Sequence, residues 1–184
     1  MYGLVNKGVR DFVIDFHGKE VWQRVQARAG AKHSDFISME GCPDSVSYSL
    51  IESAAAELSI SSDQLLEGFG EHWILYTAKQ GYGELLDVSG ASLREFLHNL
   101  NLMHARIALS YTNLRQPSFS VTEETDEQLL LHYRSHREGL TSMMTGLLRG
   151  LSKKFNEQVE VSLQESVSGG HDHDVFLVRW ELSV

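Results

Sequence analysis

The N-terminal part of the chain carries its apolar residues at the three-to-four-residue spacing of amphipathic helices. The first stripe lies in residues 2–17. Further stripes, each with a capping or stop signal beside it, cover residues 22–29, 46–58, 65–76 and 93–111. Gly81, Gly83 and Gly90 predict a loop-rich connection before the last stripe. We therefore expect this part of the chain to be all helix.

Two local signals bound the stripe at 93–111. Ser92 and Glu95 have the spacing of a capping box, in which each side chain bonds free backbone N–H groups at the start of a helix. Pro117 cannot continue the helix, which should end before it. One polar residue, His104, interrupts the apolar face of this helix.

After the proline, apolar and polar residues alternate, which is the period of half-buried strands. Such runs cover residues 119–121, 129–133, 159–163 and 175–182. A helical stripe at 140–155 separates the two pairs of strands, with Ser135 and Glu138 as a second expected capping box. The order β-β-α-β-β favours a four-stranded antiparallel sheet with helices on one face, so the predicted class is α+β.

The sequence has no internal repeat and no Pro/Ser-rich linker. We expect one domain, 1–184, with a helical lobe at about 1–62 and an α/β lobe at about 63–184.

Composition excludes several functions. The formal net charge of −9 argues against a nucleic-acid or anionic-membrane surface. Cys42 is the single cysteine, so an internal disulfide and a cysteine-based metal cluster are excluded. The sequence shows no signal-peptide core and no apolar run of about 18 residues. The reducing cytoplasm is the expected location.

Tyr133, Ser135 and Arg137 follow one another at every second position. In an extended chain such side chains point to one side. Two hydroxyls and a planar guanidinium suit a carboxylate, which the guanidinium can bind through both oxygens. The alternative is that Tyr133 is an ordinary strand aromatic, Ser135 a helix cap and Arg137 a solvated charge.

His104 also has two interpretations. A histidine on an apolar stripe can be a core residue bonded to a backbone carbonyl, or it can be a metal ligand. Combined with an apolar slot and the Tyr133–Ser135–Arg137 triad, it would suit a heme, with iron on the imidazole and propionates in the triad. The residues alone leave both interpretations open.

The remaining histidines give weaker indications of a metal-binding or catalytic role. His171 and His173 could form a metal pair on one strand face, but they follow two glycines, so the sequence favours a polar turn that enters the last strand. His132 and His136 flank the triad without an evident partner. The sequence contains no P-loop, dinucleotide-binding glycine motif, catalytic-triad order or HExxH motif, and we expect no enzyme.

The whole chain resembles the heme–nitric oxide/oxygen-binding (H-NOX) domains, gas sensors related to the heme domain of soluble guanylate cyclase. The matching segments occur in order along the chain: 1–6, 69–73, 81–86, 102–106, 133–137 and 170–174. The resemblance implies a heme b between the two lobes, with His104 as the iron ligand and the triad on the propionates. It also places Pro117 against the porphyrin.

The resemblance further implies the side of the heme that binds gas. Val5, Trp73 and Met143 correspond to the distal wall, and none of them is a good partner for bound O₂. Relatives that hold O₂ have a tyrosine where this chain has Ser142. We therefore expect a ferrous, five-coordinate heme that binds NO and CO and excludes O₂.

The expected signal is rupture of the iron–His104 bond when NO binds. Because the chain leaves no room for an output domain, we expect a bacterial stand-alone sensor that acts on a separate partner. A histidine kinase or a cyclic-di-GMP enzyme is the expected partner. Two alternatives remain: an O₂ sensor or carrier with Ser142 as donor, and a heme-free module whose triad binds another carboxylate.

Overall fold

The computed structural model describes residues 1–31, 36–111 and 114–181. Within these ranges the backbone forms seven α-helices and four strands. The chain divides into two compact units, Met1–Phe69 and Gly70–Val184, and the division falls inside α4 (Ser62–Thr77). It lies a few residues after the boundary expected from the sequence. Among the described residues, no helix is both long and apolar enough to cross a membrane.

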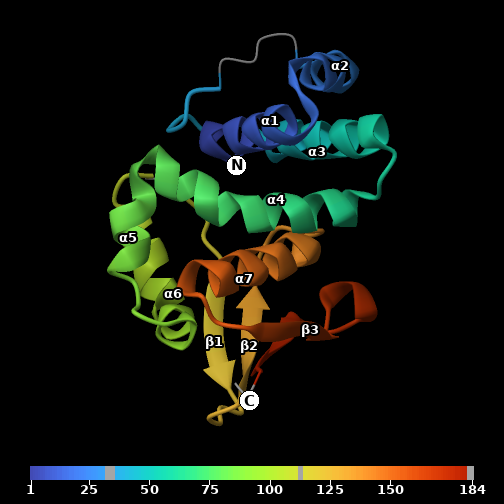
Figure 1. Cartoon of the computed structure of the whole chain (residues 1–184). Coiled ribbons are helices and arrows are strands. Elements are labelled where there is room, and N and C mark those ends of the chain that lie inside the picture. Colours follow the sequence, from blue (N-terminus) through green and yellow to red (C-terminus); the bar gives the residue numbers. More distant parts are fainter. Residues whose placement is uncertain (32–35, 112–113, 182–184) are drawn as a thin grey trace. The chain divides into compact units, whose positions relative to one another are not determined.

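The first unit is helical, as the apolar stripes predict. Three helices lie side by side in it (Figure 1): α1 (Gly3–His17), α2 (Lys19–Ala29) and α3 (Asp44–Leu58). Their apolar faces meet in a small core of nearly inaccessible side chains: Val9, Val13, Val25, Leu50 and Ala54. Burial of these side chains is the main stabilising contribution in the unit.

The loop-rich connection expected near residue 81 is wrong. Helical hydrogen bonding continues from α4 through a π-helical turn, Ala78–Tyr82, into the short helix α5 (Gly83–Asp87). Gly81 takes a φ of 93°, which glycine adopts without steric cost, so the helix kinks there instead of ending.

Helix α6 (Leu93–Ala108) begins where the capping pattern predicts. The backbone N–H of Glu95 donates to Ser92 Oγ at 3.2 Å, and the Glu95 carboxylate accepts from the Ala91 N–H at 2.9 Å. The helix ends before Pro117, as expected, although it stops three residues short of the apolar stripe at 93–111.

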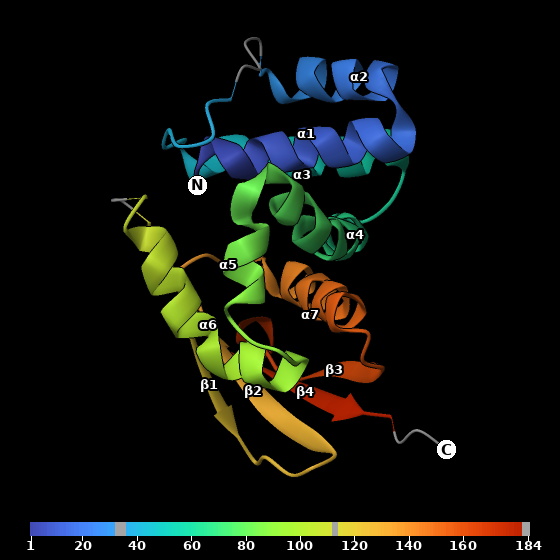
Figure 2. The same ribbon diagram turned by 60° about the vertical axis from the view of Figure 1, so that its left-hand side comes forward.

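The second unit contains the predicted sheet. Its four strands are β1 (Ser118–Thr122), β2 (Gln128–Arg134), β3 (Val159–Glu165) and β4 (Asp174–Trp180). They pair antiparallel in the order β1-β2-β4-β3. Helices α6 and α7 (Thr141–Phe155) pack on one face of this sheet (Figure 2). The α+β class is therefore confirmed.

Inward-facing residues of the strands and helices form one core. On β2 the buried positions are Leu129, Leu131 and Tyr133, which alternate with less buried neighbours. They pack with buried apolar side chains of the two helices: Phe96, Leu97, Leu100, Met144, Leu148 and Leu151. This core fixes the register of β2, because a one-residue slip would turn its apolar side chains outward.

The second expected capping box is wrong. Helix α7 has Leu140 as its N-cap residue, so Ser135 and Glu138 lie outside the helix. Residues 136–139 form bends, and Gly139 has a φ of 75°. The chain therefore reverses between β2 and α7 before helical geometry begins. Thr141 holds the start of α7 to β4 by donating from its hydroxyl to Asp174 Oδ2 at 2.6 Å.

Candidate functional site

His104 lies one turn before the end of α6. Its ring Nδ1 donates to the carbonyl oxygen of Leu100, four residues earlier, at 2.8 Å. The proton is therefore on Nδ1, and the lone pair is on Nε2. Its ring stacks on that of Phe119, with centroids 5.5 Å apart and planes 20° from parallel.

Burial keeps this imidazole neutral. Desolvation lowers the pKa of His104 below its ordinary value, although the hydrogen bond to Leu100 acts in the opposite direction. A neutral ring whose other nitrogen donates to a backbone carbonyl is the form in which histidine binds metals. A core histidine would make the same hydrogen bond, so the contact suits both interpretations of His104.

The Tyr133–Ser135–Arg137 triad gathers at the end of β2. The Tyr133 side chain is buried and shares a hydrogen bond with that of Ser135. Ser135 Oγ also accepts the backbone N–H of Arg137 at 3.1 Å. The chain is extended only through Arg134 and then bends, so a local turn, and not a straight strand, brings Arg137 to the other two.

Electrostatics link the triad as well. Burial raises the pKa of Tyr133, whereas the hydrogen bond from Ser135 and the positive charge of Arg137 lower it. Arg137 Nη1 also donates to the carbonyl oxygen of Arg115 at 3.0 Å, two residues before Pro117. One part of the simpler interpretation is wrong, because Ser135 does not cap α7.

Phe119 connects the two candidate groups, and the sequence did not single it out. Its ring lies 5.5 Å from that of His104 and 5.6 Å from that of Tyr133. Asn101 on α6 bonds both backbone groups of Phe119: its Nδ2 donates to the carbonyl at 2.7 Å, and its Oδ1 accepts the N–H at 2.9 Å. An asparagine inside a helix, one turn before His104, is the signal that could have indicated this contact.

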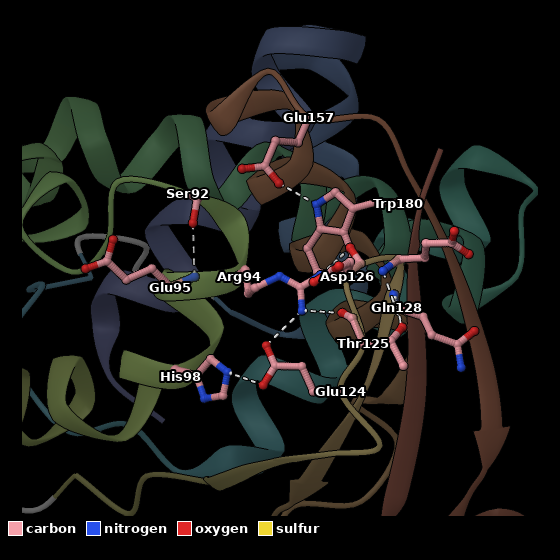
Figure 3. Close-up of polar contacts among 11 residues, drawn as sticks. Ser92, Arg94, Glu95, His98, Glu124, Thr125, Asp126, Gln128, Glu157 and Trp180 are labelled. Atoms are coloured by element: carbon pink, nitrogen blue, oxygen red, sulfur yellow. Dashed lines mark hydrogen bonds and ion pairs between the residues drawn. The ribbon is translucent and has the colours of Figure 1, made fainter. Parts of the chain in front are cut away.

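The N-terminal turn of α6 is held to the sheet by Arg94 (Figure 3). Its guanidinium donates to the Glu124 carboxylate and to the carbonyl of Thr125, each at 2.8 Å, and to the carbonyl of Asp126 at 2.9 Å. The same group lies 4.2 Å from the centroid of the Trp180 ring. The helix that carries His104 is thus fixed to the β1–β2 hairpin at one end.

The predicted distal residues fall in both units. Val5 lies on α1 in the first unit, while Trp73 on α4 and Met143 on α7 belong to the second. Ser142 is the second residue of α7, and Pro117 immediately precedes β1. All five are described, and their roles toward a heme remain predictions.

The segment before β4 is the polar turn that the sequence favours, and not a metal pair on a strand face. His171 and His173 both precede β4, so the polar-turn interpretation is correct. His171 pairs with Glu165 at 3.3 Å, and His173 contacts His132 instead. Among the described residues, no group of three or more His, Cys, Asp or Glu side chains forms a metal centre.

A neutral imidazole on an amphipathic helix, with a nearby set of groups suited to carboxylates, fits the expectation of a heme-binding sensor domain on this α+β fold. The chain belongs to the haem-NO-binding family, whose model matches residues 2–163.

Relatives of known sequence are larger proteins. Soluble guanylate cyclase gcy-34 of Caenorhabditis elegans is 32% identical over 97% of this chain, and soluble guanylate cyclase gcy-32 of the same organism matches equally well. The chain spans 28% of the length of each.

Solved structures show the same fold. The H-NOX protein from S. oneidensis in the Fe(II)NO state superposes with a TM-score of 0.89 at 19% identity, covering 99% of this chain and 100% of that one. The unliganded Fe(II) H-NOX protein from K. algicida gives a TM-score of 0.85 at 23% identity, covering 100% and 98%.

Proposed function

We propose that this domain senses NO through a bound heme b, that it also binds CO, and that it excludes O₂. The main support is the match of residues 2–163 to the haem-NO-binding family. His104 fits the role of iron ligand, because its Nδ1 donates to the Leu100 carbonyl and leaves the lone pair of Nε2 for the iron. When bound, the heme supplies an iron with an open position for a diatomic gas.

The triad supplies partners for the heme propionates. Arg137 offers a planar guanidinium that can bind a carboxylate through both oxygens, and the Tyr133 and Ser135 hydroxyls add donors beside it. Pro117 would contact the porphyrin, and Val5, Trp73 and Met143 would line the side on which gas binds. The absence of a strong donor among those three wall residues disfavours bound O₂, which carries partial negative charge.

The signal passes through α6. His104 would hold the iron, and its release on NO binding would free the last turn of α6 to shift. Arg94 and Asn101 hold the rest of the helix to β1 and the hairpin, so motion concentrates beyond Asn101. Packed interfaces tend to switch between discrete arrangements, so a small shift of the end of α6 can produce a larger conformational change.

The proposal places the output in a separate protein in the cytoplasm, a histidine kinase or a cyclic-di-GMP enzyme, and gives this domain no catalytic role. The named relatives are cyclases of which this chain spans 28%, which is consistent with a sensing domain whose output lies elsewhere. The partner and the domain need only prefer the same state for the signal to pass.

The test uses the reduced protein with NO, CO and O₂. We expect the Soret band to shift with NO and with CO, and no stable oxy spectrum in air. In amide NMR spectra, NO should shift α6 resonances after Asn101 in the native protein. In the His104→Gly variant those resonances should already be shifted, and NO should add nothing.

Each contrary result identifies an alternative. A stable oxy spectrum would favour an O₂ sensor or carrier with Ser142 as donor. A protein without a Soret band after expression with ample heme would favour a carboxylate-binding module. If NO moved α6 resonances equally in the His104→Gly variant, release of His104 would not be the signal.

A further inference from the structure

Two imidazoles meet on the sheet, at positions that the heme proposal does not use. His132 lies on β2 between the inward-facing Leu131 and Tyr133, so its side chain is on the face away from α6 and α7. His173 lies directly before β4, the strand that pairs with β2. His132 Nδ1 and His173 Nε2 are 2.7 Å apart.

The outer nitrogen of each ring is also engaged. His173 Nδ1 contacts the Asp172 carboxylate at 2.5 Å, and His132 Nε2 contacts the Thr122 hydroxyl at 2.7 Å. A carboxylate only accepts hydrogen bonds, so His173 carries its proton on Nδ1 and turns the lone pair of Nε2 toward His132.

The Thr122 hydroxyl decides what lies between the rings, because it can donate or accept. If it donates to His132 Nε2, the proton of His132 is on Nδ1 and bonds His173. If it accepts from Nε2, the two inner nitrogens, 2.7 Å apart, are bridged either by a second proton on His132 or, with the rings further apart, by a metal ion.

We propose that this pair is a binding site for a divalent transition-metal ion such as Zn²⁺ or Cu²⁺, held by His132 Nδ1 and His173 Nε2. Asp172 orients one ligand and Thr122 the other, as outer partners do in carboxylate–histidine–zinc sites. Metal–nitrogen bonds of about 2.0–2.1 Å at a tetrahedral angle place the two nitrogens roughly 3.3 Å apart. The rings therefore need to separate by about half an ångström.

The charges around the pair are mixed. Burial, His173 and Arg134 lower the pKa of His132, whereas Glu165 and Glu123 raise it, so the two carboxylates offset part of the opposition to positive charge there. His173 is 9% exposed and so is well ordered by packing, while the neighbouring Asp172 is 82% exposed. Water therefore reaches the edge of the site and can complete the coordination, and imidazole ligands favour zinc, copper and nickel.

The test is a Zn²⁺ titration of the untagged, heme-loaded protein by calorimetry, with Cu²⁺ electron paramagnetic resonance as a second probe. We expect one ion per chain and a copper spectrum with two nitrogen ligands. His132→Asn and His173→Asn should each abolish binding, and Asp172→Asn should weaken it by about 10–100-fold because the ligand loses its outer partner. His171→Asn is the matched control and should bind normally.

Circular dichroism and the Soret band check that each variant is folded. Should a histidine variant fail to fold, nitrogen NMR of the native rings gives the same answer, since zinc should shift His132 Nδ1 and His173 Nε2 above all. The proposal is overturned if the native protein binds neither ion, if both asparagine variants bind as tightly as the native protein, or if zinc leaves both ring nitrogens unshifted.

Discussion

At the scale of single residues, Glu124 joins two side chains of α6. Its carboxylate accepts from Arg94 at 2.8 Å and contacts His98 Nε2 at 3.0 Å. These contacts, with Arg94 the larger, lower the pKa of Glu124 below its ordinary value of 4.5. A carboxyl group with a depressed pKa stabilises the folded state above its unfolded pKa, and that contribution is lost as the pH falls through the folded pKa.

Glu124→Gln should therefore lower the free energy of unfolding near neutral pH, and its deficit relative to the native protein should shrink as the pH falls below 4.5. Urea unfolding over a pH series measures this difference. The group is exposed, so added salt should also reduce the deficit. Glu127→Gln on the same hairpin is the control. A deficit that stays constant from neutral to acid pH would mean that the charge of Glu124 contributes nothing.

The residues found from the sequence are those whose signal is local. His104 interrupts an apolar stripe, and the triad repeats at every second position, so both stand out in the chain itself. The His132–His173 contact was missed because it depends on which strands pair and in what register. Phe119 was missed for the same reason, since its role depends on packing between β1 and α6.

At the scale of elements, the helix starts show what a local pattern can and cannot decide. The capping pattern at Ser92 is confirmed, whereas the same spacing at Ser135 predicts a helix start that does not exist. The difference lies in Gly139, whose positive φ of 75° reverses the chain before α7. A conformation selected by the surrounding fold overrides the pattern.

The contact between α4 and α7 is made by backbone against backbone. A Cβ placed on Gly70 would lie 2.3 Å from the carbonyl oxygen of Met143 and 2.9 Å from the backbone nitrogen of Leu147. A Cβ on Gly150 would lie 2.7 Å from the carbonyl oxygen of Glu71. Backbone atoms cannot move aside as the end of a flexible side chain can. The two helices therefore approach this closely because α4 has glycine at position 70 and α7 has glycine at position 150.

Gly70→Ala should therefore destabilise the protein by about 1–3 kcal/mol, which outweighs the helix propensity that alanine gains. Denaturant unfolding measures the loss. Gly41→Ala is the control, because a Cβ at Gly41 meets open space and should change stability little. An alanine variant at position 70 as stable as the native protein would show that α7 moves aside at no cost.

At the scale of the molecule, the sequence predicts which helices and strands each unit contains better than it predicts the order of the strands in the sheet. Helical and alternating periods distinguish the helical first unit from the β-β-α-β-β second unit, and the α+β class follows. The strand order β1-β2-β4-β3 places the last strand inside the sheet and β3 at its edge. The spacing of apolar residues along the chain does not specify this strand order. It is set by pairing between segments that are far apart in the sequence.

Heme removal should lower the stability of the whole domain. A ligand that binds only the folded state stabilises it by about 2.7 kcal/mol at a free concentration of 100 times Kd, so the heme-loaded protein should melt at a higher temperature than the heme-free protein. Metal-free protoporphyrin should stabilise the native protein less than heme, because it keeps the propionates and loses the iron. In the His104→Gly variant the two porphyrins should stabilise equally. If heme and metal-free protoporphyrin stabilised the native protein equally, His104 would not be the iron ligand. If neither porphyrin stabilised it, the proposal that the domain binds heme would be wrong.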